Sequence, residues 1–161
     1  MMLDKIWNRT FKIPLLHFNE VHLWCHNFSS LFTYKDLFIS SMNSEEIKRV
    51  ELFASPQDKL NYTISRGFLR HILSLYLNCP KKDVQFTYNQ YGKPSLLGHE
   101  NLYFNLSHAN QMFLIGICKQ FNIGVDIEFM QKNLDIVNVA KRFFTDAESQ
   151  TLNNLPEEKI G

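Results

Sequence analysis

A long amphipathic helix, predicted over residues 55–78, constrains the fold of this chain more than any other segment. Ser55 is a residue type that caps helix N-termini, Pro56 suits the first turn, and Pro80 prevents the helix from continuing. Apolar side chains recur along it at helical spacing and cover a broad arc, which is its predicted buried face. They are Leu60, Ile64, Phe68, Leu69, Ile72, Leu75 and Tyr76.

Three cations lie on a narrow stripe outside this arc. They are Lys59, Arg66 and Arg70, at spacings of seven and four residues, with no acid interleaved on the stripe. Like charges at such spacing repel each other by a few tenths of a kcal/mol per close pair. An anion bound on the stripe would explain the arrangement, and so would a plain solvated face.

A shorter helix is predicted to begin at Ser44, which serves as its cap. Glu45 and Glu46 then lie in the first turn, where acids are favoured by the helix dipole. The residues expected on the buried side of this helix are Ile47, Val50 and Phe53.

Short segments after the long helix have strand character. Strands are predicted over residues 82–88, 102–106, 111–118 and 123–129. A tight turn containing Gly92 and Lys93 follows the first of them. Ser107 and His108 come just past the predicted end of the second strand, where side chains and free backbone N–H groups can meet a ligand.

The last predicted strand carries two carboxylates on one face. Ile123, Val125 and Ile127 alternate with Gly124, Asp126 and Glu128, so one face is apolar and the other acidic. Mg²⁺ typically takes one or two protein carboxylates, keeps several waters and takes other ligands from substrate phosphates. An ordinary edge strand with a solvated acidic face shows the same alternation.

A helix is predicted over residues 134–144, and a capping box follows it. Thr145 and Glu148 have the spacing of such a box, in which the third helical residue reaches back to the cap. Glu148 therefore has a structural role available to it.

Composition excludes several classes of function. The net charge of +1 over 161 residues gives no bulk attraction to nucleic acid or to membranes. The longest apolar run, residues 112–118, is far too short to span a bilayer. Three widely spaced cysteines fit reduced thiols, so we expect a cytoplasmic protein.

The order of motifs resembles that of one enzyme family. Ser65-Arg66-Gly67, Gly92-Lys93-Pro94, the run 105–108, the run 124–128 and the run 140–144 with Glu148 follow one another at suitable intervals. This pattern is similar to that of the 4′-phosphopantetheinyl transferases of the large, surfactin-synthetase-activating type, over residues 44–150. The resemblance implies an α+β fold of two similar halves. Residues 1–120 would form a complete first half that contacts coenzyme A, and residues 121–161 an incomplete second half.

The resemblance also implies an activity. Such enzymes transfer the 4′-phosphopantetheine group of coenzyme A to a serine of an acyl or peptidyl carrier protein, with Mg²⁺. It implies that Asp126 and Glu128 bind the metal and that Glu148 takes the serine proton, directly or through water. The residues that it assigns to coenzyme A are Arg49, Arg66, Lys93, Ser107 and His108.

Two departures from the family pattern stand out. Glu46 occupies a position where a basic residue is common, which is expected to weaken phosphate binding. The chain ends before a W-x-x-K-E-A-like motif, since its tryptophans are Trp7 and Trp24. We therefore expect a truncated protein that is only marginally stable alone, self-associates through its uncovered apolar strand face, or is a fragment of a longer product. The alternative to an enzyme is a non-catalytic module that binds coenzyme A or a carrier protein.

Overall fold

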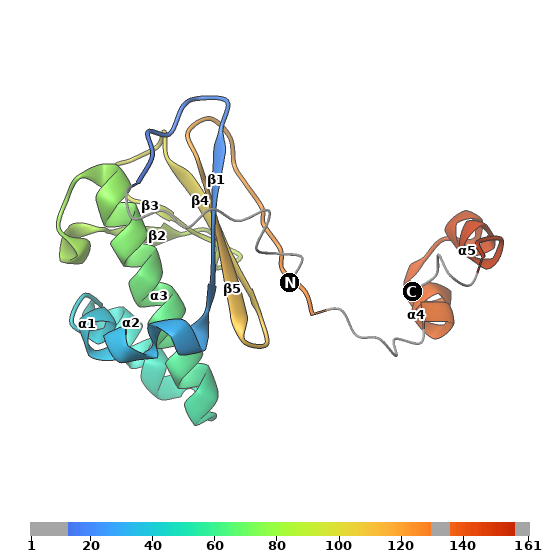
Figure 1. Ribbon diagram of the computed structural model, residues 1–161, viewed down its shortest axis with the longest axis horizontal. Helices are drawn as coiled ribbons and strands as arrows, with labels where there is room; N and C mark the ends of the chain where they lie inside the picture. The colour runs from blue at the N-terminus through green and yellow to red at the C-terminus, as the bar shows by residue number, and fades with distance from the viewer. Residues whose placement is uncertain (1–12, 130–135, 157–161) are drawn as a thin grey trace. The chain divides into compact units, whose positions relative to one another are not determined.

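The computed structural model describes residues 13–129 and 136–156, and the chain forms two compact units, residues 1–128 and 129–161 (Figure 1). The first unit combines helices with antiparallel sheets, which confirms the α+β prediction. The second contains α4 (Ile136–Phe143) and α5 (Asp146–Asn153). The proposed division of a longer enzyme after residue 120 stays a prediction.

The first unit is built on a three-stranded antiparallel sheet. Its strands are β1 (Val21–Asn27), β5 (Met112–Cys118) and β4 (Tyr103–Ala109), in that order, so β4 lies at an edge. A second, two-stranded sheet pairs β2 (Phe86–Tyr88) with β3 (Pro94–Leu96), and β3 contacts β4. The two sheets therefore meet at the β4 edge, where three of the predicted motifs lie.

Helices cover one face of the larger sheet (Figure 1). The long α3 (Pro56–Leu77) has the predicted Ser55 cap and ends at Asn78, whose φ of 50° is left-handed. A 3-10 helix η2 (Phe28–Tyr34), α1 (Lys35–Ile39) and α2 (Ser44–Leu52) precede it, and the 3-10 helix η3 (Lys81–Asp83) follows it. The core between α3 and the sheet includes Ile64, Phe68, Leu69, Ile72, Phe113, Ile115 and Ile117.

Gly67 allows α3 to approach α1 closely. A Cβ added at this position would overlap the Phe38 side chain and lie 2.8 Å from the Phe38 Cα. Because backbone must move to relieve that contact, we expect Gly67→Ala to lower the free energy of unfolding by about 1–3 kcal/mol despite alanine's better helix propensity. Urea unfolding measures the effect. The control is Gly124→Ala, where the added Cβ meets nothing within 4 Å; an equal loss in both variants would contradict the packing argument.

His26 is a titratable group in the aromatic core. Its ring lies 4.5 Å from that of Phe68 and 6.0 Å from that of Phe113, and burial lowers its pKa. The unfolded chain then binds more protons than the folded one below the ordinary histidine pKa of about 6.5. We expect the free energy of unfolding to fall as the pH drops from 7.5 to 5.5. His26→Phe should reduce this dependence, and a change of the exposed His99 to Gln should leave it as it is.

Three local predictions were wrong. The strand predicted over residues 102–106 continues to Ala109, and the one predicted over 82–88 is limited to Phe86–Tyr88, after η3. The structure assigns no strand to residues 123–129, although the predicted alternation of half-buried and exposed residues holds from Ile123 to Glu128. The predicted helix over 134–144 corresponds to α4, and its first two residues lie outside the described part of the chain.

Candidate functional site

Side chains of β4 hold the acidic segment, residues 123–128, beside the sheet edge. The Asn105 carboxamide oxygen accepts from the Val125 N–H at 2.8 Å. The Ser107 hydroxyl donates to Asp126 Oδ1 at 2.6 Å and lies 3.3 Å from the Ile127 N–H, which donates to it. Side chains thus replace the backbone ladder of a regular strand, which explains why the alternation survives without a strand.

The apolar side of the acidic segment covers the sheet. A Cβ added at Gly116, in the middle of β5, would lie 2.5 Å from Val125 Cγ1 and 3.0 Å from Ile123 Cδ1. The side chains of Ile123 and Val125 are therefore packed rather than uncovered. Phe129, which follows the segment, is exposed. The packing of Ile123 and Val125 removes part of the reason for expecting self-association, which stays a prediction.

Lys93 ties the turn between β2 and β3 to the same segment. Its Nζ donates to the Ile123 carbonyl oxygen at 3.0 Å. The Asn89 side chain accepts from the Tyr91 and Lys93 N–H groups, each at 2.9 Å, and so orders the turn. The structure thereby brings together three of the predicted motifs, those of Lys93, Ser107 and Asp126.

Ser107 and His108 lie within β4, not past its end as predicted. Successive residues of a strand point to opposite faces, so the two side chains diverge. Ser107 faces Asp126, whereas His108 is exposed and pairs across the ladder with Phe113. The side chains of Ser107 and His108 therefore lie on opposite faces of the sheet.

The donor set of the acidic segment fits a hard divalent cation. Asp126 and Glu128 are both exposed and alternate along the segment. Within the described ranges, no group of three or more His, Cys, Asp or Glu side chains could enclose a metal. Two carboxylates suffice for Mg²⁺, which keeps waters and takes phosphate oxygens.

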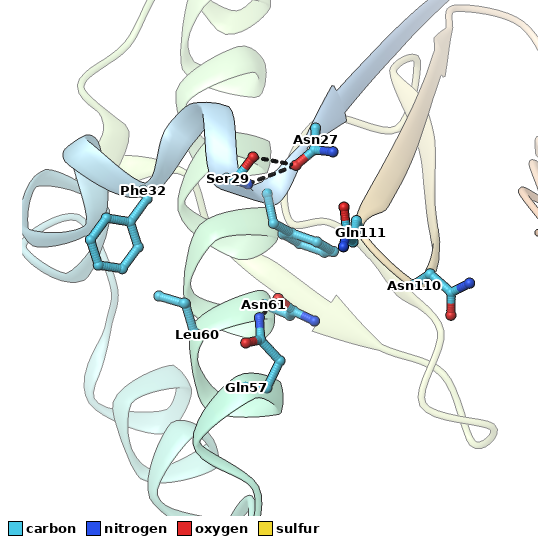
Figure 2. A pocket seen from close by; sticks show the side chains of 9 residues that line it. Asn27, Ser29, Phe32, Gln57, Leu60, Asn61, Asn110 and Gln111 are labelled. Atoms are coloured by element: carbon cyan, nitrogen blue, oxygen red, sulfur yellow. Dashed lines mark hydrogen bonds between the residues drawn. The ribbon is translucent and has the colours of Figure 1, made fainter.

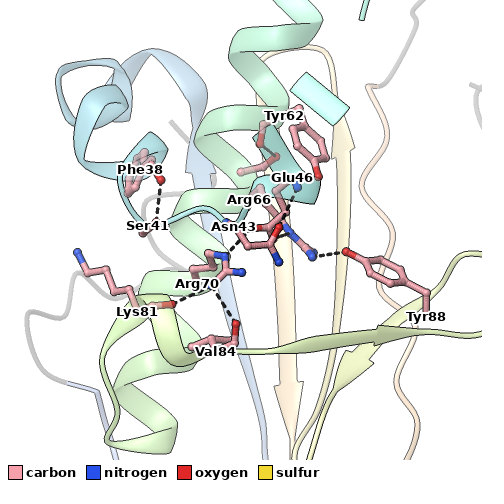
Figure 3. Close-up of polar contacts among 11 residues, drawn as sticks. Phe38, Ser41, Asn43, Glu46, Tyr62, Arg66, Arg70, Lys81, Val84 and Tyr88 are labelled. Carbon is pink, nitrogen blue, oxygen red and sulfur yellow. Dashed lines mark hydrogen bonds and ion pairs between the residues drawn. The ribbon is translucent and has the colours of Figure 1, made fainter. Parts of the chain in front are cut away.

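Arg66 and Arg70 of the basic stripe of α3 are buried, contrary to the prediction of a solvated or ligand-bound face (Figure 3). Lys59, the third cation of the stripe, is half-buried. Glu46, Arg66 and Arg70 are 2%, 5% and 1% exposed. Arg66 Nε donates to Glu46 Oε1 at 2.5 Å, and Arg70 Nε donates to Glu46 Oε2 at 2.7 Å. The anion on this stripe is thus a carboxylate of the protein itself.

Glu46 also caps α2. Asn43, rather than the predicted Ser44, is the N-cap, and Glu46 Oε2 accepts from the Asn43 N–H at 3.0 Å. Glu46 is therefore a structural anion in this chain, whereas Ile47, which was expected on the buried side, is 40% exposed. The Asn43-to-Glu46 spacing of a capping box was the sequence signal for this role.

Arg66 and Arg70 direct their remaining donors differently. Arg66 donates through a terminal nitrogen to the Tyr88 hydroxyl at 2.5 Å, and its guanidinium lies 3.8 Å from the ring centre of Phe86. Arg70 donates to the carbonyl oxygens of Lys81 and Val84, both at 2.9 Å. Direct contact between Arg66 and a ligand phosphate would require this pairing to open.

Arg49 is an exposed cation on α2, the helix that contributes Glu46 to the buried cluster of Glu46, Arg66 and Arg70. It lies in the last turn of α2, and its guanidinium is 5.9 Å from the ring centre of Tyr62. Burial raises the pKa of the Tyr62 hydroxyl, while the nearby Arg66 acts in the opposite direction. Arg49 is consequently better exposed to a ligand than Arg66.

Glu148 performs the predicted capping role in the second unit. Its Oε2 accepts from the Thr145 N–H and from the Thr145 hydroxyl, both at 2.8 Å. These hydrogen bonds lower the pKa of the exposed carboxyl. A lowered pKa makes this carboxylate a weaker proton acceptor.

None of the residues predicted for the site lines a hollow of about 640 Å³ (Figure 2). Five of its nine lining residues carry a carboxamide, and Phe28, Phe32 and Leu60 are its apolar members. The amide-bearing residues are Asn27, Gln57, Asn61, Asn110 and Gln111. The hollow has no charged side chain in its lining and so does not match a phosphate-rich ligand.

Comparison with known proteins identifies the family. Residues 32–119 match the family model described as 4′-phosphopantetheinyl transferase, N-terminal. The chain therefore belongs to the 4′-phosphopantetheinyl transferase family. No described helix is long and apolar enough to cross a membrane.

Individual relatives agree with this assignment. The chain is 33% identical to the 4′-phosphopantetheinyl transferase HetI of a Nostoc species, over 88% of this chain and 61% of the relative. It is 38% identical to a putative 4′-phosphopantetheinyl transferase of a Synechocystis species, over 73% and 49%. It is 28% identical to the 4′-phosphopantetheinyl transferase Sfp of Bacillus subtilis, over 71% and 50%. The chain thus spans between about half and three-fifths of the length of these curated relatives.

One solved structure has a weaker likeness. Holo-ACP-synthase from Plasmodium yoelii aligns with a TM-score of 0.47 and 14% identity, over 63% of this chain and 93% of that one. Its TM-score is too low to support an argument about this fold.

Proposed function

We propose that this chain acts in the transfer of the 4′-phosphopantetheine group from coenzyme A to a serine of an acyl or peptidyl carrier protein, as in the large, surfactin-synthetase-activating type. The observation that carries the proposal is the meeting of three motifs at the β4 edge. Lys93 holds the Ile123 carbonyl there, and Ser107 holds Asp126. A cation and a hydroxyl can bind the oxygens of a pyrophosphate ligand, and a carboxylate pair can hold the Mg²⁺ that such a ligand shares.

Each proposed residue has a physical task. Arg49, Lys93 and His108 bind and orient the phosphates of coenzyme A, and Arg66 contributes its charge from beneath the surface. Ser107 orients Asp126, which with Glu128 would hold Mg²⁺. When bound, the metal neutralises charge on the pyrophosphate and so makes its phosphorus a better electrophile.

The proposed reaction is a nucleophilic displacement at phosphorus. The serine oxygen of the carrier protein forms a bond to the phosphorus of the phosphopantetheine group, and the bond to the bridging oxygen breaks. Adenosine 3′,5′-bisphosphate leaves with that oxygen, and the serine proton passes to a base. Glu148 is the proposed base, directly or through a water.

One observation favours a second candidate, a module that binds coenzyme A or a carrier protein without chemistry. The Glu148 carboxylate already accepts two hydrogen bonds from Thr145. Proton transfer to Glu148 would have to compete with this capping role.

Transfer from labelled coenzyme A to a purified carrier protein, with Mg²⁺ present, tests the proposal. We expect label on the carrier serine and none when that serine is changed to alanine. Binding of coenzyme A by calorimetry without transfer would instead favour the binding module. If the chain shows neither coenzyme A binding nor transfer at high protein concentration, both candidate functions are overturned.

A further inference from the structure

We propose that Tyr88 is a ligand-contacting hydrogen-bond donor and that Glu46 is the buried residue that positions it through Arg66. The inference rests on the proposed function, because the ligand is the phosphate-bearing co-substrate of that site. Figure 3 shows the side chains of Glu46, Arg66 and Tyr88 in a row, with Arg66 between the Glu46 carboxylate and the Tyr88 ring.

The Tyr88 hydroxyl has a proton to give. A phenol carries one proton and accepts through its lone pairs. Among the described residues, its hydrogen bond is the one that it accepts from Arg66, at 2.5 Å. The side chain is 47% exposed, so the hydroxyl proton can be donated to an acceptor outside the protein.

The buried cluster makes that donor stronger. Glu46 carries one negative charge against the two positive charges of Arg66 and Arg70, so the cluster has a net charge of +1 beneath the surface. Arg70 is satisfied by two backbone carbonyls, which leaves Arg66 as the cation that reaches toward solvent through Tyr88. A hydroxyl that accepts from a cation is polarised and becomes a better donor to an anion.

Tyr88 is placed where such an anion is expected. It ends β2 and pairs with Pro94, the neighbour of Lys93, whose Nζ contacts the acidic segment at Ile123. Tyr88 therefore links the two regions: its hydroxyl contacts Arg66 of the buried cluster, and its strand partner Pro94 follows Lys93 in the chain. The chemical class that fits is a phosphate oxygen of a nucleotide or of the phosphopantetheine group.

Glu46 and Arg66 act on the ligand indirectly. Two contacts hold the guanidinium group of Arg66. Its Nε donates to Glu46, and its flat face lies over the ring of Phe86. Its terminal nitrogen has little freedom, and the Tyr88 hydroxyl is accordingly fixed. Glu46 and Arg66 are positioning residues in this account, and Tyr88 is the residue in contact.

Calorimetry with the 161-residue chain tests the contact. Tyr88→Phe removes only the hydroxyl, and we expect it to weaken coenzyme A binding roughly tenfold or more, as for a hydrogen bond to a charged group. Tyr34→Phe, which removes the hydroxyl of a tyrosine that is 50% exposed on η2, should leave the affinity unchanged. Parallel titrations with adenosine 3′,5′-bisphosphate and with 4′-phosphopantetheine show which phosphate accepts the bond.

A double-mutant cycle tests the positioning. Arg66→Lys keeps the charge but loses the planar fork, and it should weaken binding severalfold in the parent chain and no further in the Tyr88→Phe background. Glu46→Gln, which keeps a side-chain acceptor, should show the same pattern and serves where Arg66→Lys does not fold.

Four outcomes are distinguishable. Equal affinity of the parent and Tyr88→Phe overturns the inference and leaves the proposed function standing. Additive losses in the cycle overturn the positioning role. A parent chain that binds neither coenzyme A nor the bisphosphate overturns the proposed function and the inference with it. If Tyr88→Phe weakens coenzyme A binding but the parent chain transfers nothing to the carrier protein, the inference is supported and the proposed transfer activity is overturned.

Discussion

Glu46→Ala is expected to lower the free energy of unfolding by about 3–5 kcal/mol, which is the usual cost of removing one partner of a buried ion pair. The change leaves the guanidinium groups of Arg66 and Arg70 buried without their anion. It also removes the side chain that accepts from the Asn43 N–H at the start of α2. A domain with a total stability of about 5–15 kcal/mol would lose much of it.

Two matched variants separate the causes. Glu45→Ala removes an exposed acid from the same first turn, and it should change the free energy of unfolding by only about 0.5 kcal/mol. Glu46→Gln keeps one acceptor oxygen for the Asn43 N–H, and it removes the charge and the second acceptor oxygen. Urea unfolding of the three variants measures the differences. If Glu46→Ala cost no more than Glu45→Ala, the buried ion pairs of Glu46 would not stabilise the fold.

Local signals predicted the elements well where the chain itself contains the cause. The Ser55 cap, the Pro56 first turn and the apolar arc are all within α3, and the predicted helix is observed. The Thr145–Glu148 capping box is also local and is confirmed. The burial alternation of residues 123–128 follows from side-chain chemistry, even though the backbone there forms no ladder.

The burial of Arg66 and Arg70 could not be predicted from α3 alone. Charged residues outside an apolar arc are normally solvated, and the partner of Arg66 and Arg70 comes from a different helix. The sequence places Glu46 in the first turn of its helix, but nothing local indicates that its carboxylate pairs with two arginines of the next helix. Only tertiary packing brings its carboxylate to within 2.7 Å of both guanidinium groups.

The sequence motifs predicted which residues lie close together at the β4 edge, but not the direction of their side chains. Residues 105–109 contain no turn signal that marks the end of β4, and the strand's length is set by its pairing with β5. That length puts Ser107 and His108 on opposite faces. The contact of Lys93 with the Ile123 carbonyl joins elements that are 30 residues apart, a pairing with no local sequence signal.

Asp126→Ala is expected to reduce transfer to the carrier protein by roughly a hundredfold or more, because charge neutralisation at the pyrophosphate supplies several kcal/mol and each 1.36 kcal/mol is a factor of ten. Asp126 is exposed, and its hydrogen bond from Ser107 is at the surface, so the free energy of unfolding should change by less than about 1 kcal/mol. The same variant should abolish the Mg²⁺-dependent part of coenzyme A affinity.

The control for charge is Asp83→Ala, which removes an exposed carboxylate from η3 in the same unit. It should leave both transfer and Mg²⁺-dependent binding unchanged. Ser107→Ala should have an intermediate effect, since it frees Asp126 to rotate without removing the carboxylate. Calorimetry of coenzyme A binding with and without Mg²⁺ decides the matter even where transfer is slow. Mg²⁺-dependent binding that survives Asp126→Ala would show that the acidic segment is only a solvated edge of the sheet.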